Sequence, residues 1–147
     1  MPSIDKNSAQ ARRKLPSPLM EIMDAFVLGQ WGASIEHFAD DASLISFVDD
    51  GLQAVLETEV SPIVLNGPIA MAGYIALFGA HLAPMRYDVI SVAHNGFQIA
   101  TELEWWSKPE RGLNGRTCIV WNLRPDGKVQ SVFKVGWITP TSAPAVG

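Results

Sequence analysis

Apolar residues recur at helical spacing in the first part of the chain and at alternate positions in the last part. The first helical stripe follows Ser17-Pro18, where a capping hydroxyl precedes a proline suited to the first turn, and it stops at Gly29. A short second helix is expected over 34–38. A third is expected to open at Asn66-Gly67-Pro68 and to end at Pro84. The first and third stripes comprise Leu19, Ile22, Met23, Phe26 and Val27, and Met71, Tyr74, Ile75, Phe78 and Leu82.

From Met85 onward apolar and polar residues alternate, as they do in strands that bury one face. Tight-turn residues interrupt the pattern at His94-Asn95-Gly96 and Pro125-Asp126-Gly127. An earlier strand is expected over 42–48, and 52–65 is interpreted as a loop with a short strand near Ile63. The later strands are expected over 86–93, 97–106, 116–123 and 129–138, with a longer hairpin loop over 109–115. Helices followed by a strand meander predict an α+β fold with an antiparallel sheet.

The length and composition fit one domain, because 147 residues that are 48% hydrophobic can bury a substantial core. We expect a disordered N-terminal arm over 1–16, a single domain over 17–139 and a C-terminal tail over 140–147. The N-terminus lacks the apolar stretch of a secretory signal, and no apolar run is long enough to span a bilayer. The single cysteine, Cys118, excludes an intrachain disulfide and fits a reducing compartment. We therefore expect a cytoplasmic protein.

Charge and motifs argue against several partners. The formal net charge is -4 and the sequence pI is about 5.2, whereas a nucleic-acid-binding domain needs a basic face. His37, His81 and His94 are scattered without metal-ligand spacing, and no Gly-rich phosphate loop or dinucleotide motif is present. We therefore expect no metal, no cofactor, no nucleic acid and no membrane.

Three local motifs, in this order of elements, carry a resemblance to a known superfamily. They are His37-Phe38-Ala39-Asp40-Asp41-Ala42, Asn95-Gly96-Phe97 through Trp106, and Pro125-Asp126-Gly127-Lys128-Val129 before the last strand. From 17 to about 139 the chain resembles the nuclear-transport-factor-2-like superfamily, which includes the SnoaL-like cyclases, ketosteroid isomerase and limonene-epoxide hydrolase. The resemblance implies a cystatin-like cone, in which three N-terminal helices pack on a curved, mostly antiparallel sheet and enclose a pocket.

The superfamily's catalytic residues carry over only in part. The position that resembles the isomerase's aspartate base falls on Ser46, and the isomerase's protonated acid falls near Ile119 or Val120. The Arg, Asp, Asp set of the epoxide hydrolases falls on Glu102, Glu104 and Lys134, so that charges are kept while their identities change. Neither family mechanism is therefore expected unaltered.

Alternation divides the last three strands into two faces, since side chains two apart share a face of the sheet. In one assignment the bulky face packs on the helices and the polar face meets water. The resemblance implies the reverse: Glu102, Glu104 and Lys134 point into the pocket, and the bulky face forms a homodimer through Trp105, Trp121 and Trp137. We favour the second assignment, because so large an apolar area must be buried. The bulky set is Ile99, Leu103, Trp105, Ile119, Trp121, Leu123, Phe133, Val135 and Trp137; the polar set is Glu102, Glu104, Arg116, Cys118, Val120, Asn122, Gln130, Val132 and Lys134.

The favoured assignment suggests general acid–base chemistry. Two glutamates in a partly apolar cavity do not ionise together cheaply, and Lys134 would favour the charged form of one of them. One acid could then protonate a carbonyl or epoxide oxygen while the other removes a proton or activates water. This predicts a cofactor-free isomerase, cyclase or hydratase/hydrolase that acts on a hydrophobic metabolite. The further residues expected to contact substrate are Ser46, Arg116, Cys118, Asn122, Phe26, Trp31 and Phe78.

Two other classes of function stay open at this stage. The domain could be a non-catalytic module that holds a ligand or serves as a dimeric partner. It could also be a small subunit of a ring-hydroxylating dioxygenase, because such subunits share this fold, although no partner-binding insertion is visible. The sequence does not identify a substrate.

Overall fold

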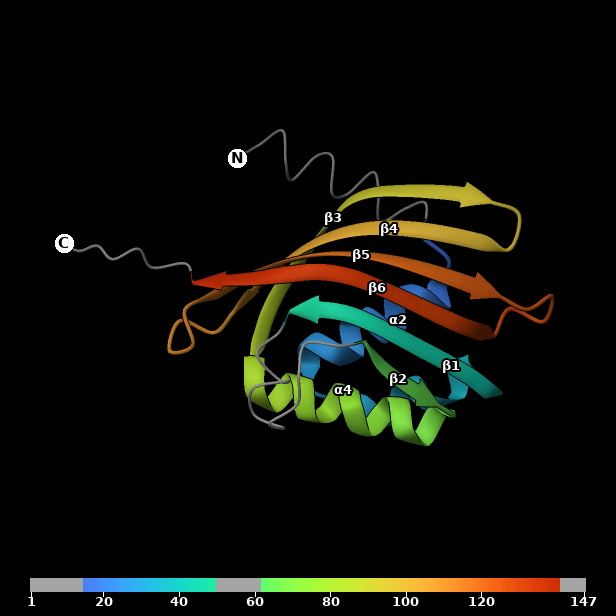
Figure 1. Cartoon of the computed structure of the whole chain (residues 1–147), viewed down its shortest axis with the longest axis horizontal. Coiled ribbons are helices and arrows are strands. Elements are labelled where there is room, and N and C mark those ends of the chain that lie inside the picture. Colours follow the sequence, from blue (N-terminus) through green and yellow to red (C-terminus); the bar gives the residue numbers. More distant parts are fainter. Residues whose placement is uncertain (1–14, 50–61, 141–147) are drawn as a thin grey trace.

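The computed structural model describes residues 15–49 and 62–140, and these form helices on one side of a curved sheet (Figure 1). The predicted α+β order is confirmed. The predicted short strand near Ile63 is present, whereas the rest of the expected 52–65 loop lies largely outside the described residues. The elements are α2 (Ser17–Leu28), the 3₁₀ helix η1 (Trp31–His37), β1 (Phe38–Asp49), β2 (Ile63–Asn66), α4 (Pro68–Leu82), β3 (Pro84–Asn95), β4 (Gln98–Ser107), β5 (Leu113–Leu123) and β6 (Val129–Pro140).

The prediction of three N-terminal helices is wrong, because the described residues contain two α-helices and the expected second helix is η1. Gly29 ends α2 in the left-handed conformation at φ 74°, and Phe38 is already extended at the start of β1. The few residues between them wind as a tight 3₁₀ connector, which suits short links. Ser17 lies inside the first turn of α2 and is not its cap, since Pro16 holds that position without a side-chain hydrogen bond.

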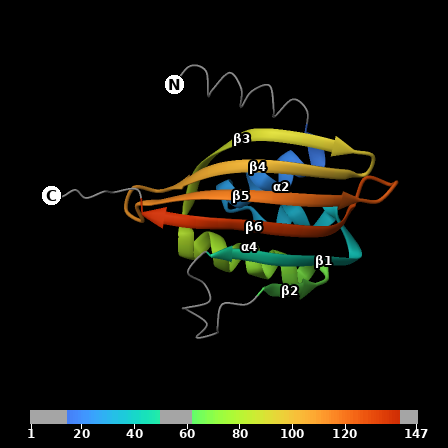
Figure 2. The same cartoon turned by 45° about the horizontal axis from the view of Figure 1, so that its top comes forward.

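The sheet has six strands in the order β2-β1-β6-β5-β4-β3. The β1–β6 pair is parallel and the other pairs are antiparallel, so the mostly antiparallel sheet is confirmed. Figure 2 shows α2 and α4 behind the strands. No described element covers the other side of the sheet. We call the side covered by the helices the inner face and the opposite side the outer face.

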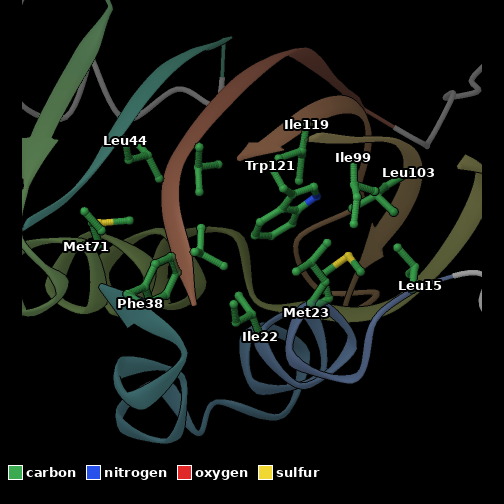
Figure 3. Close-up of a cluster of buried hydrophobic side chains, with 14 of the residues drawn as sticks. Leu15, Ile22, Met23, Phe38, Leu44, Met71, Ile99, Leu103, Ile119 and Trp121 are labelled. Atoms are coloured by element: carbon green, nitrogen blue, oxygen red, sulfur yellow. The ribbon is translucent and has the colours of Figure 1, made fainter. Parts of the chain in front are cut away.

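The main core lies between α2 and the inner face (Figure 3). Ile22 and Met23 point from the helix towards Trp121 and Ile119 on the sheet. Burial of each such side chain stabilises the fold by about 1.5–3 kcal/mol. Leu15, which the sequence analysis assigned to the arm, is buried in this core. Most of the predicted arm and most of the predicted tail, 1–14 and 141–147, lie outside the described residues.

A second, smaller core lies between α4 and β4. It consists of Tyr74, Phe78 and Leu82 from the helix and Trp105 from β4. Neither α-helix of the described residues is long and apolar enough to cross a membrane.

Candidate ligand-binding cavity

Strand register determines which side chains share the inner face, because directly opposed residues point the same way. The first row across β1, β6, β5 and β4 is wholly apolar, and the second places Ser46 beside Lys134. Continuing along the strands, the third row contains Thr117 and the fourth contains Trp105 opposite Gly115. The rows are Leu44, Val132, Trp121 and Ile99; Ser46, Lys134, Ile119 and Thr101; Gly136, Thr117 and Leu103; and Ile138, Gly115, Trp105 and Tyr87.

A partly open cavity of about 90 Å³ lies between these rows and the helices. Its helical wall comes from α2 and α4, and its floor comes from β1, β4, β5 and β6. The wall is almost entirely apolar, with Thr117 and Lys134 as its polar floor residues in the described part of the chain. The lining residues are Ile22, Met23, Phe26, Phe38, Leu44, Tyr74, Ile75, Phe78, Leu103, Trp105, Thr117, Ile119, Trp121, Val132 and Lys134.

Among the described residues that line this cavity, Lys134 is the only one with a charged side chain. Its ammonium nitrogen lies 4.7 Å from the ring centroid of Phe78 and 5.8 Å from that of Tyr74. The negative faces of aromatic rings attract a cation at this range, by about 0.5–2 kcal/mol depending on exposure. The lysine therefore lies against two aromatic rings in an otherwise mostly apolar lining.

The rings around Phe78 form an aromatic cluster with Phe26, Tyr74 and Trp105. The centroid of Phe78 lies 5.3 Å from that of Phe26, 5.7 Å from that of Tyr74 and 6.4 Å from that of Trp105. Gly115 makes room for Trp105, since a Cβ atom at Gly115 would overlap the indole ring. This glycine therefore determines the position of one wall of the cavity.

The structure contradicts the placement expected for Glu102 and Glu104. Both lie on the outer face, because Glu102 is opposite Cys118 and Glu104 is opposite Arg116, whereas the neighbouring Leu103 and Trp105 face the helices. The side chain of Glu102 is 35% exposed, and its Oε2 lies 3.5 Å from Nε of Arg116. Glu104 accepts a hydrogen bond of 3.2 Å from Asn114 Nδ2. The two acids therefore do not share a cavity with Lys134.

The other predicted contact residues divide between the faces. Phe26 and Phe78 line the cavity, and Ser46 is fully buried beside Lys134. Arg116, Cys118 and Asn122 lie on the outer face, so the expectation that they contact a ligand in the cavity is wrong. The side chain of Trp31 lies outside the described part of the structure.

The favoured assignment, with the polar set inward, is wrong for β4 and β5, whose bulky residues face the helices, and agrees with the structure on β6. Val132 and Lys134 point inward opposite Trp121 and Ile119, while Phe133, Val135 and Trp137 point outward. Trp105 and Trp121 are buried beneath the helices, whereas Trp137 is 56% exposed. The three tryptophans therefore do not form one surface. The outer face carries a group of exposed apolar side chains, which we call the outer apolar patch. It consists of Phe47, Val64, Phe133, Val135 and Trp137.

Sequence reasoning missed two polar features near the cavity. Thr117 lies two residues before Ile119 and would have been found by assigning the bulky face of β5 to the helices. Tyr87, opposite Trp105 on β3, donates a 2.6 Å hydrogen bond from its hydroxyl to Asp24 Oδ1 on α2. Sequence offers no signal for this pair, because its members are 63 residues apart.

No protein-family model matches the chain, and no curated protein matches its sequence. Solved structures do match it. The SalBIII epoxide hydrolase/cyclase-like enzyme, which has a role in pyran ring formation in salinomycin, has a TM-score of 0.63 and 18% identity over 91% of this chain and 98% of its own. A SnoaL-like protein of unknown function from Burkholderia thailandensis has a TM-score of 0.57 and 14% identity over 88% and 93%.

A protein from Catenulispora acidiphila with a ketosteroid isomerase-like fold, solved in complex with trimethylamine, has a TM-score of 0.58 and 15% identity over 82% of this chain and 85% of its own. The similarity in structure establishes a shared fold, but at identities this low it leaves the activity undetermined. The chain therefore has the cystatin-like fold of the SnoaL-like, NTF2-like and ketosteroid-isomerase-like proteins, as its motifs predicted.

Proposed function

We propose that the protein binds a small hydrophobic molecule in the cavity between α2, α4 and the inner face. The observation that carries the proposal is an apolar cavity whose described lining includes a single charged residue, Lys134. Apolar walls with a few placed polar groups are the usual composition of a small-molecule site. The trimethylamine complex of the Catenulispora protein is consistent with ligand binding by this fold.

The size of the cavity limits the ligand. At about 90 Å³ it is smaller than the apolar cavity of about 150 Å³ that accommodates benzene in an engineered protein. We expect it to receive a compact molecule, or one end of a longer molecule whose remainder leaves through the opening.

Catalysis is a second candidate, and the position of Lys134 favours it. An ammonium held in an apolar space can stabilise an oxygen that gains negative charge during an isomerisation or cyclisation. The SalBIII cyclase-like enzyme, which has the same fold, supports this candidate. The acid pair expected from the sequence is absent from the described cavity lining, so the base would have to come from elsewhere. Binding is therefore the function that the geometry supports best.

We also propose a homodimer through the outer face. The support is the outer apolar patch, in which Phe47 packs against Phe133 with ring centroids 5.5 Å apart. Contiguous exposed apolar surface of this kind marks association sites. The dimer would bury Trp137, while Trp105 and Trp121 remain inside each subunit.

Methyl NMR with 1-hexanol, whose chain can enter the cavity by one end, tests the cavity directly. We expect shifts at the methyl groups of Leu103, Ile119 and Val132, and none at the exposed Leu28. Ile75→Trp should abolish these shifts, because Ile75 lines the cavity from α4 and a larger side chain would fill it. Ile69→Trp is the matched control, since Ile69 lies on the same helix and is 80% exposed. Equal shifts in both variants would contradict the proposal.

A further inference from the structure

We infer that the cavity takes compact neutral carbonyl compounds, such as short methyl ketones, whose oxygen accepts a hydrogen bond from the indole N–H of Trp105. This inference rests on the proposed binding function and specifies its ligand class. Its basis is a pair of polar groups in the cavity lining, the indole N–H of Trp105 and the hydroxyl of Thr117. Neither group has a hydrogen-bond partner among the described residues.

Both groups belong to buried residues, but they are not sealed off. Trp105 is 4% exposed and Thr117 is 5% exposed. Among the described side chains, Nε of Arg116 is the one polar atom that is fully enclosed without a hydrogen-bond partner, and Arg116 lies on the outer face. The unpaired groups of Trp105 and Thr117 are therefore reachable, and the space that both residues line is the cavity.

Nearby polar side chains of the inner face are satisfied within the protein. The indole N–H of Trp121 donates to Thr101 Oγ1 at 3.1 Å, and that hydroxyl donates to the carbonyl oxygen of Ile119 at 3.4 Å. The hydroxyl of Tyr87 donates to Asp24. Because a buried polar group without a partner is costly, the two unpaired groups mark the place where a ligand supplies the missing contact.

Two glycines make room for these groups over the floor of the sheet. The edge of the Trp105 indole that carries Nε1 lies over Gly115, and Thr117 Oγ1 lies 3.1 Å from the Cβ position of Gly136. Gly115 and Thr117 are two residues apart on β5, so they share a face and lie about 7 Å apart. A carbonyl oxygen has two lone pairs and can accept from both groups when it lies between them.

The chemistry of these groups determines the ligand class. An indole N–H only donates, so a ligand at Trp105 must present an acceptor, and a hydrocarbon would leave the N–H unpaired. The rest of the lining is mostly apolar, and the cavity of about 90 Å³ favours a short chain. A short methyl ketone meets these conditions, because its acceptor oxygen lies near one end and the remainder is alkyl.

The test compares two ligands of similar size and shape. They are pentan-2-one and 2-methylpent-1-ene, in which a CH₂ group replaces the carbonyl oxygen. Both should shift the cavity methyl groups in NMR spectra of the unmodified protein. Only the ketone should move the indole proton of Trp105 downfield, as a new hydrogen bond does. The indole proton of Trp121 is the internal reference, because its N–H is already donated to Thr101.

Two substitutions measure the contacts as affinities. Trp105→Phe and Thr117→Val should each lower the affinity for the ketone relative to the alkene by about fivefold, as expected for one lost hydrogen bond. The ratio is used because a change in cavity size affects both ligands. Trp106→Phe and Thr139→Val are the matched controls, since Trp106 and Thr139 lie outside the cavity lining.

The outcomes separate the two proposals. If the ketone shifts the cavity methyl groups but not the indole proton of Trp105, or if the alkene moves that proton equally, the carbonyl inference is wrong while the hydrophobic site stands. An affinity ratio that stays unchanged in both Trp105→Phe and Thr117→Val would overturn it as well. If neither compound shifts the cavity methyl groups, the proposed binding function itself is wrong. Since the indole measurement needs only the unmodified protein, poor folding of a variant does not leave the inference undecided.

Discussion

Lys134 and Phe78 meet in the wall of the cavity, with the ammonium nitrogen of the lysine 4.7 Å from the centroid of the ring. The lysine comes from β6 and the phenylalanine from α4, so the contact joins the sheet to a helix that covers it. It also places the charged group of the cavity beside the aromatic cluster.

A double-mutant cycle measures this contact. Lys134→Met and Phe78→Leu should together destabilise the protein by about 0.5–2 kcal/mol less than the sum of the single changes, because the first change already removes the cation–π attraction. Urea unfolding of the four proteins provides the coupling energy. Lys128→Met combined with Phe78→Leu should be additive, and a coupling of similar size there would mean that the effect is not local.

Gly115→Ala should displace Trp105 from the cavity wall. The added methyl group would occupy the space of the indole ring, so we expect a loss of about 1–3 kcal/mol of stability and a changed near-UV circular dichroism spectrum. Gly73→Ala on α4 is the control, because a Cβ atom there meets nothing within 4 Å. That change should raise stability by up to about 1 kcal/mol, since alanine favours the helix. An unchanged spectrum in Gly115→Ala would show that the indole does not depend on this glycine.

Glu102→Gln and Glu104→Gln should leave ligand binding in the cavity unaltered, because both acids lie on the outer face. Glu102 and its partner Arg116 are 35% and 38% exposed, and partly exposed ion pairs contribute at most about 1 kcal/mol. Urea unfolding and NMR titration with hexanol provide the two measurements. A tenfold loss of hexanol affinity in either variant would mean that these acids reach the ligand after all.

Trp137→Lys should weaken the proposed dimer. A two-fold interface contains each residue twice. If each copy of the substitution weakens association about tenfold, the dimer dissociation constant rises about a hundredfold. Sedimentation velocity over a range of concentrations measures this constant. Ile69→Lys, on the helical side of the molecule, should not change it. A monomer at all concentrations in the unmodified protein would refute the dimer, and an unchanged constant in Trp137→Lys would place the interface elsewhere.

Local signals account for the features that sequence predicted well. Gly29 ends the first helix in the left-handed conformation, and Gly96 and Gly127 have positive φ in the two hairpin turns named from their residues. Such features depend on a few neighbouring residues, so they can be recognised without the rest of the chain. The same holds for the alternation within each strand, which correctly paired Leu103 with Trp105.

The sequence by itself determined the order of the elements, the turns between them and which residues of a strand share a face. Only the tertiary structure decided which of the two faces the helices cover. On β6 the outward set of Phe133, Val135 and Trp137 is more apolar than the inward Val132 and Lys134, so hydrophobicity alone assigns this strand the wrong way round. The pairing of Lys134 with Ile119 sets the orientation, because opposed residues in adjacent strands must point to the same side of the sheet.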